Sequence, residues 1–237
     1  MRAACDRLQA EAMALGHEFG PGATLHRGSQ FVLGEVASGP LRGQPRIDRV
    51  VWCGAAEPEL LQVGVDPRLL GVAAQVLGTL AMDQLINQVH FKLPYDGVTF
   101  PWHQDCRHRR WGTPEWTDVN GRGSFVEMVT ALDECRLDNG PLFFVQGSPR
   151  HGPIATSAPE HVLPERYIER NELVAATMDA GDVLLFGPYV IHGSFENTSE
   201  RPRRLLLNGY AAPGANRRVY PGDGAGRRVL YTPLGNA

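Results

Sequence analysis

The stretch Val98-Thr99-Phe100-Pro101-Trp102-His103-Gln104-Asp105 is the most informative part of the chain. It has the character of an extended strand, and residues two positions apart on a strand point to the same side. The imidazole of His103 and the carboxylate of Asp105 are therefore predicted to face one point in space. Gln104 is expected to point away from that point and to serve as scaffold.

A second candidate ligand, His192, lies far downstream in the segment from Gly181 to Ser194. Two histidines and one carboxylate on one face of a metal leave three coordination positions open, which is typical of non-haem Fe(II) oxygenases. The sequence thus predicts His103, Asp105 and His192 as metal ligands and catalytic residues.

Arg203 opens the next apolar segment, and its planar fork suits bidentate capture of a carboxylate, such as the far end of 2-oxoglutarate. Its neighbour Arg204 is expected to face outward or to pair with an acid, since only one of the two can face a cavity.

Around these residues the pattern is β-rich, with helices near the N-terminus. Helices are predicted over 2–15, ended by Gly16, and over 67–80, where Asp66 can cap and Pro67 suits the first turn. A short hairpin is expected around residues 31–33. Strands are predicted over 84–93, 98–105, 124–132, 142–146, 173–178, 183–186, 189–195 and 203–211.

Bulk properties are those of an ordinary globular protein. The chain has 237 residues and a formal net charge of −3, which gives no reason to expect nucleic acid or a membrane as partner. Four scattered cysteines without a Cys-x-x-Cys argue against structural zinc and fit a reducing, cytoplasmic compartment. No signal peptide is expected. The anticipated partner is a small-molecule substrate, and the anticipated state is a monomer or homodimer.

At these residues the chain resembles the phytanoyl-CoA dioxygenase family of Fe(II)/2-oxoglutarate oxygenases. The resemblance covers roughly residues 66 to 212. It is carried by Trp102-His103-x-Asp105, by His192-Gly193-Ser194, by Arg203 at the family's spacing, by Ala131-Leu132-Asp133 and Asn139-Gly140-Pro141-Leu142, and by Gln146-Gly147-Ser148-Pro149 as an altered form of a family turn.

The resemblance implies a mainly β fold with flanking α, a double-stranded β-helix (a cupin-like jelly roll). It implies one oxygenase domain over 1–237, with a helical part over about 1–82, a jelly-roll core over about 83–212 and a tail over 213–237. Fe(II) would be the cofactor, with 2-oxoglutarate and O₂ as co-substrates. The expected reaction is hydroxylation of an unactivated C–H bond of a small metabolite, an amino-acid derivative or natural-product intermediate, with release of succinate and CO₂.

Further candidate residues surround the triad. Ser194, two positions beyond His192, and Gln88 could contact 2-oxoglutarate. Gln88, His90 and Lys92 alternate and so share one strand face, from which they could reach co-substrate or substrate; Lys92 could equally extend to solvent.

The segment from Arg107 to Asn120 follows the metal strand directly. It is expected to fold over the open coordination positions and to help set substrate identity. Within it, Trp111 and Trp116 are candidate substrate contacts. Arg109 belongs to a basic run that either forms an electropositive rim for an anionic substrate or is a solvated loop.

Two other functions stay open at this point. One is a cupin-like metalloenzyme, an isomerase or hydrolase that uses zinc or manganese without 2-oxoglutarate. The other is a catalytically silent binding module on the same barrel. Arg203 argues against the first, because that chemistry does not need it, and the intact triad argues against the second.

Overall fold

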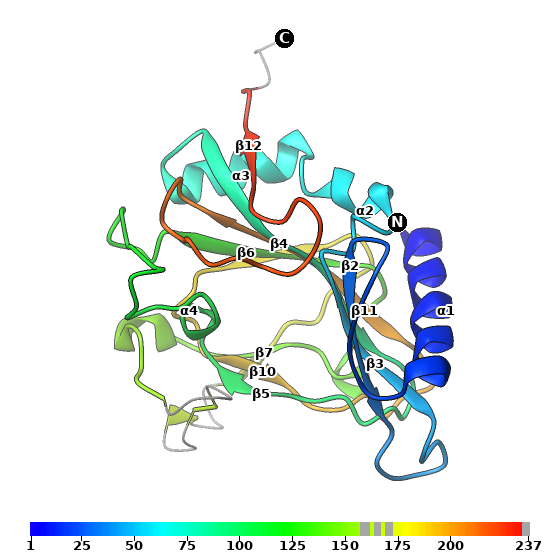
Figure 1. Ribbon diagram of the computed structural model, residues 1–237. Coiled ribbons are helices and arrows are strands. Elements are labelled where there is room, and N and C mark those ends of the chain that lie inside the picture. The colour runs from blue at the N-terminus through cyan, green and yellow to red at the C-terminus, as the bar shows by residue number, and fades with distance from the viewer. Residues whose placement is uncertain (157–161, 164–166, 169–172, 234–237) are drawn as a thin grey trace.

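Two antiparallel β-sheets face each other in the computed structural model of the chain (Figure 1). The structure describes residues 1–156, 162–163, 167–168 and 173–233. The predicted fold class is confirmed: the chain is mainly β, with two sheets in jelly-roll fashion and a helix at the N-terminus.

The larger sheet carries most of the strands and most of the side chains that face the space between the sheets. Its order is β1 (Gly22–His26), β2 (Ser29–Glu35), β3 (Pro45–Val51), β4 (Ala81–Lys92), β11 (Arg203–Ala211), β6 (Phe125–Ala131) and β9 (Val183–Phe186), and β12 (Arg227–Leu230) also pairs with β4.

The smaller sheet places the two predicted metal histidines side by side. Its order is β5 (Phe100–His103), β10 (His192–Ser194), β7 (Phe143–Val145) and β8 (Leu173–Ala175). The register of β5 and β10 sets His103 directly opposite His192. Antiparallel pairing thus brings together two residues that are far apart in sequence.

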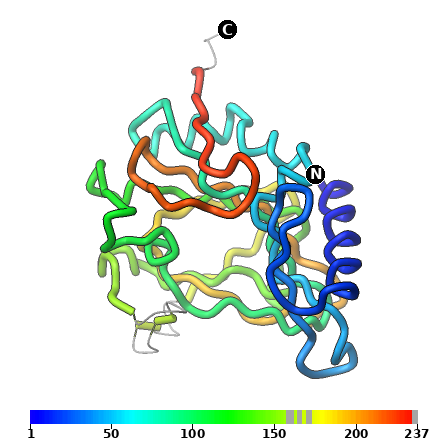
Figure 2. Tube along the Cα trace, viewed as in Figure 1, coloured from blue at the N-terminus to red at the C-terminus, as the bar shows by residue number. Residues whose placement is uncertain are grey.

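Helices cover the outer face of the larger sheet (Figures 1 and 2). They are α1 (Arg2–Phe19), α2 (Pro58–Val63) and α3 (Pro67–Leu77). The short α4 (Asp105–His108) instead follows β5 at the space between the sheets, and 3₁₀ turns lie at Leu137–Asn139 and Ser148–His151. As predicted, the Asp66 side chain caps α3 by accepting from the Arg68 amide. The helix ends at Leu77, three residues earlier than predicted, because Gly78 adopts a left-handed φ of 70°. None of the described helices is long and apolar enough to span a bilayer.

Alternation along β11 separates the outer core from the inner one. Leu206 faces outward into the core beneath α1. Leu205 and Leu207 face inward, in a second core that lies between the sheets. A third core packs α3 on Met82, Val126, Met128 and Tyr210. The space between the sheets is therefore lined by every second residue of each strand.

The N- and C-terminal parts differ from expectation. Residues 22–51 form three strands that extend the larger sheet, not one short hairpin in a helical region. Charged residues on β3 hide its strand pattern. Helix α1 continues past Gly16, where an added Cβ would approach Pro45 Cβ to 2.7 Å, so this glycine serves close packing inside the helix and does not end it. The tail contributes β12.

Candidate active site

The metal-ligand segment is shaped by a buried glutamine. The Gln104 amide donates to the carbonyls of Tyr189 (2.6 Å) and Gly152 (2.9 Å), and its oxygen accepts from the Ile154 amide (2.8 Å). These bonds confirm that Gln104 is scaffold. They also fix the point at which the strand ends.

The prediction that His103 and Asp105 share one strand is wrong. Strand β5 ends at His103, and Asp105 is the first residue of α4. The turn at Gln104 brings the carboxylate toward the histidine, so Asp105 Oδ1 lies 3.8 Å from His103 Nε2. Convergence of the two side chains rests on this turn and not on the two-residue period of a strand.

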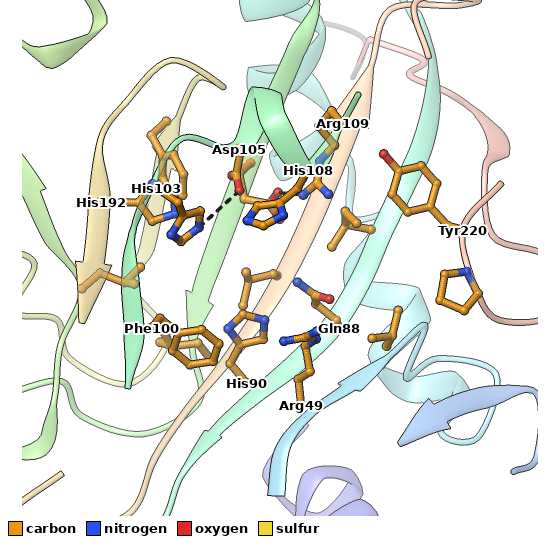
Figure 3. A pocket seen from close by; sticks show the side chains of 18 of the residues that line it. Arg49, Gln88, His90, Phe100, His103, Asp105, His108, Arg109, His192 and Tyr220 are labelled. Carbon is orange, nitrogen blue, oxygen red and sulfur yellow. Dashed lines mark hydrogen bonds and ion pairs between the residues drawn. The ribbon is translucent and has the colours of Figure 1, made fainter. Parts of the chain in front are cut away.

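One ligand atom from each of His103, Asp105 and His192 lies within 4.8 Å of the other two (Figure 3). In each imidazole, Nδ1 is hydrogen-bonded to the backbone carbonyl of the residue two positions earlier. The partner is Pro101 for His103 (2.6 Å) and Val190 for His192 (3.1 Å). With Nδ1 as donor, Nε2 is left as the metal-binding nitrogen of each ring.

The protonation states fit a divalent metal. Burial, with the neighbouring His192, lowers the pKa of His103 to about 3, so the ring is neutral at pH 7. Burial alone would raise the pKa of Asp105, but His192 and Arg109 outweigh it and lower that pKa to about 2. Neutral imidazoles and an ionised carboxylate are the forms that bind metal.

A cavity of about 320 Å³ opens beside these ligands. The larger sheet lines it with Gln88 and His90 from β4, as the sequence predicted, and with Arg49 and Glu127 from β3 and β6. The segment after β11 closes one side with Arg218, Tyr220 and Pro221. These last residues lie in the part of the chain that was expected to be a tail.

The side chains of Arg203 and Arg204 point to opposite sides of β11, as expected. Arg204 faces outward and makes a two-pronged contact with Asp133 (2.7 and 2.9 Å). Arg203 faces inward, is fully buried, and donates from Nε and Nη2 to the Gly140 carbonyl (2.9 and 2.5 Å).

Beyond the triad, a set of donors lies behind the cavity wall. Arg203 Nη1 and Ser194 Oγ are buried without a hydrogen-bond partner among the described residues. Lys92, opposite Arg203 in the sheet, donates to the Phe195 carbonyl. Arg203, Ser194 and Lys92 do not themselves line the cavity.

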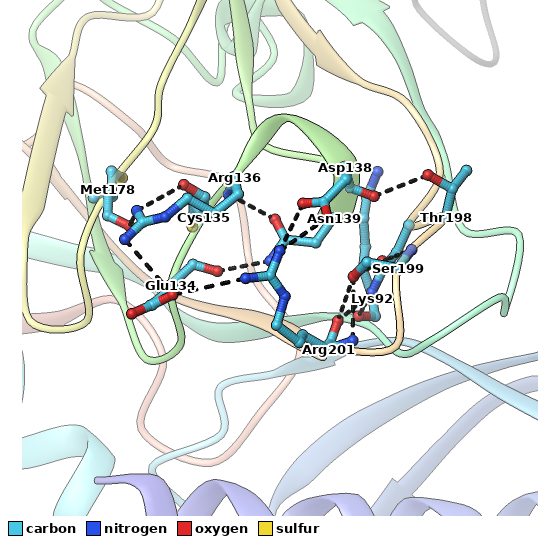
Figure 4. A network of polar contacts seen from close by, with 11 residues as sticks. Lys92, Glu134, Cys135, Arg136, Asp138, Asn139, Met178, Thr198, Ser199 and Arg201 are labelled. Atoms are coloured by element: carbon cyan, nitrogen blue, oxygen red, sulfur yellow. Dashed lines mark hydrogen bonds and ion pairs between the residues drawn. The ribbon is translucent and has the colours of Figure 1, made fainter.

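The turn that carries Gly140 is held by a polar network (Figure 4). Arg201 binds Asp138 through two contacts of 2.9 Å, and the Asn139 amide donates to the Glu134 carbonyl at 2.8 Å. Arg136 adds bonds to the Met178 carbonyl (2.7 Å) and Asp179 (2.5 Å). This network fixes the carbonyl on which Arg203 rests.

Residues 107–120 do not supply the predicted tryptophans to the cavity. Trp116 is only 7% exposed and packs in the inner core, and Trp111 packs against that core with Arg107 4.8 Å from its ring. Neither lines the cavity, because their rings are used in packing. The segment reaches the cavity through His108 and Arg109 instead.

Arg109 is not part of an exposed electropositive rim. Its side chain is 7% exposed and its Nη2 lies 3.1 Å from Glu127 Oε2, whose side chain is 1% exposed. The guanidinium also lies over the rings of Phe125 (4.7 Å) and Tyr220 (5.7 Å). Burial raises the pKa of Glu127, and Arg109 opposes this rise.

Sequence reasoning missed five polar residues of the cavity: Gln30, Arg49, Glu127, Arg218 and Tyr220. One of them had a local signal. Glu127 is a single acid within the otherwise apolar stretch Phe125-Val126-Glu127-Met128-Val129. A charge inside a strand that is buried on both faces indicates a partner or a function. The other four had no such signal.

A family model described as phytanoyl-CoA dioxygenase (PhyH) matches residues 2–205. Among curated proteins, the chain is similar to an L-proline trans-4-hydroxylase of Streptomyces griseoviridis, with 29% identity over 61% of this chain and 59% of that protein. It is also similar to an ectoine dioxygenase of Halomonas elongata (31%, covering 58% and 45%) and to a 2-aminoethylphosphonate dioxygenase of an uncultured bacterium (25%, covering 60% and 50%). The chain spans about half the length of these curated relatives.

Two solved structures share the fold. AviO1 from Streptomyces viridochromogenes superposes with a TM-score of 0.62 at 20% identity, covering 94% of this chain and 85% of that one. EctD from S. alaskensis with 2-oxoglutarate and 5-hydroxyectoine superposes with a TM-score of 0.60 at 24% identity, covering 81% and 70%. At these identities the likeness concerns the fold.

Proposed function

This chain belongs to the phytanoyl-CoA dioxygenase family, and we propose that it is an Fe(II)- and 2-oxoglutarate-dependent dioxygenase that hydroxylates an unactivated C–H bond of a small metabolite. Under this proposal residues 1–237 act as one oxygenase domain. The observation that carries the proposal is the cluster of His103, Asp105 and His192 at the wall of a cavity.

The donor set suits Fe(II). His103, Asp105 and His192 would hold the ion through two imidazole nitrogens and one carboxylate oxygen, on one face. When bound, iron with 2-oxoglutarate supplies the activation of O₂ that inserts oxygen into a C–H bond and releases succinate and CO₂. The protein's own groups orient the reactants and exclude water.

For 2-oxoglutarate we propose Arg203, Ser194 and Gln88. Arg203 Nη1 and Ser194 Oγ are buried donors without a hydrogen-bond partner in the described chain. A carboxylate could accept hydrogen bonds from both. Gln88 lines the cavity, whereas the other two lie behind its wall. Engagement of Arg203 therefore requires side chains near the wall to move.

The substrate we propose is small. A cavity of about 320 Å³ is at the lower end of ligand-pocket sizes. The named activities of the relatives concern L-proline, ectoine and 2-aminoethylphosphonate, all small molecules. An amino-acid derivative or a natural-product intermediate fits both observations. His90, and Arg109 through its place in the lining, are proposed to contact it.

The proposal is tested by anaerobic titration of the protein with Fe(II) and 2-oxoglutarate. A weak visible charge-transfer band is expected in the wild type and should be lost in His103→Ala and in His192→Ala. Both variants should remain folded by circular dichroism, because the ligands sit at strand ends. With L-proline, ectoine and 2-aminoethylphosphonate as candidate substrates, succinate formation should follow the same pattern. Turnover that survives both substitutions, or a wild type without the band, would refute the assignment.

A further inference from the structure

We infer that Arg49 holds an oxyanion of the primary substrate, a carboxylate or a group of similar charge, and that the substrate is therefore an anion. This inference rests on the proposed function and deepens it. Arg49 lies on β3, outside the segments in which the sequence predicted functional residues.

Sheet register places Arg49 against the cavity. Arg49 is paired with His90 across β3 and β4, so both side chains point to the inner face. The His90 ring is stacked on Phe100 with a centroid distance of 4.7 Å. Figure 3 shows the guanidinium of Arg49 beside Gln88 and His90, across the cavity from the triad.

Arg49 is half-buried and uncommitted, unlike the buried arginines Arg109, Arg203 and Arg204. Arg109 is paired with Glu127, Arg203 rests on the Gly140 carbonyl, and Arg204 is paired with Asp133. For Arg49 the described chain provides neither a hydrogen bond nor an ion pair within contact distance. The adjacent Asp48 binds Arg46 instead, at 2.9 Å.

The unpartnered guanidinium carries an energetic cost that an anion would relieve. Burial lowers the pKa of Arg49, with Asp48 opposing. A guanidinium nevertheless remains charged at neutral pH, so it is held partly dehydrated without a counter-ion. Such a group has no structural benefit in the ligand-free protein, and its planar fork suits bidentate binding of an oxyanion.

The remaining charges of the cavity favour the same conclusion. Arg109 is already engaged by its 3.1 Å contact with Glu127, and Asp105 is one of the three proposed metal ligands. Burial lowers the pKa of His90 far below its usual value, so that ring is neutral. Arg49 and Arg218 are left as positive charges of the lining. Arg218 already donates to the His108 carbonyl, which leaves Arg49 as the free anion partner.

The decisive experiment uses Arg49→Met, which keeps length and removes charge, and Arg46→Met as matched control on the same strand. The wild-type complex with Fe(II) and 2-oxoglutarate, without oxygen, is titrated with acetate and methylphosphonate at constant ionic strength, and binding is read from the charge-transfer band. We expect both probes to bind the wild type and Arg46→Met, and at least about tenfold more weakly to Arg49→Met. Equal binding to wild type and Arg49→Met, or no binding to wild type, would overturn the inference.

A second readout separates substrate from co-substrate. The affinity for 2-oxoglutarate should be the same in Arg49→Met and wild type; a loss of roughly tenfold or more would instead assign Arg49 to the co-substrate and overturn the inference. Arg49→Met should also unfold at a temperature no lower than the wild type, because it removes a half-buried charge that has no ion-pair partner among the described residues. Failure of the proposed function is distinguishable, since the wild type would then lack the band altogether.

Discussion

The buried pair of Arg109 and Glu127 yields the sharpest stability prediction. Arg109→Met would leave the Glu127 carboxyl, 1% exposed, without the one ion pair at 3.1 Å that it forms within the described part of the chain. Breaking one side of a buried pair costs about 3–5 kcal/mol, whereas a surface substitution changes stability by less than about 0.5 kcal/mol. The loss of stability expected from Arg109→Met is thus roughly tenfold larger if Arg109 is buried in an ion pair than if it is exposed on a rim.

The assay is equilibrium unfolding in urea. With an m-value of about 3 kcal/mol per molar, the Arg109→Met midpoint should fall by about 1–2 M. Glu127→Met should show a similar loss. The double variant should lose much less than the sum, giving a coupling of at least about 2 kcal/mol.

The pH dependence provides an internal check. Burial raises the pKa of Glu127 and Arg109 opposes this, so removing Arg109 raises the pKa further. A carboxyl that holds its proton when folded and releases it when unfolded makes stability fall as pH rises. The deficit of Arg109→Met should therefore be flat below about pH 7, grow as the pH rises above about 8, where the wild-type Glu127 loses its proton, and vanish from the double variant. Single losses below about 1 kcal/mol that add without coupling would refute the buried pair.

Two further predictions concern Arg203 and Lys92, which lie behind the cavity wall. Arg203→Ala should raise the 2-oxoglutarate requirement by at least about tenfold, since a charge-assisted pair contributes roughly 2–4 kcal/mol; Arg204→Ala should cost stability, through Asp133, but leave that requirement unchanged. Burial, with Arg203, lowers the pKa of Lys92 to about 6. Above that pH, Lys92 keeps its proton in the unfolded chain but not in the folded protein. The free energy of unfolding of the wild type should therefore rise between about pH 6 and pH 10, by up to about 1.4 kcal/mol per pH unit. In urea unfolding, Lys92→Met should flatten this rise. Equal 2-oxoglutarate effects of both arginine variants, or equal slopes with and without Lys92, would contradict these assignments.

The sequence by itself determined the identity of the metal ligands and the positions of most of the strands, from β4 to β11. Strand alternation is a local property, which is why β4, β6, β9 and β11 were predicted to within a few residues. His103, Asp105 and His192 stood out because their residue types have few other joint uses. The division between Arg203 and Arg204 followed from the same two-residue period.

Only the tertiary structure decided what surrounds the ligands. Asp105 leaves the strand because the Gln104 side chain bonds to segments about 50 and 85 residues away. Arg109 donates to Glu127 on β6, 18 residues further along the chain, and Arg49 reaches the cavity because β3 pairs with β4. Trp116 is drawn into the core instead of the cavity. Pairing between distant strands sets which charges meet and which remain free, and no local pattern carries that information.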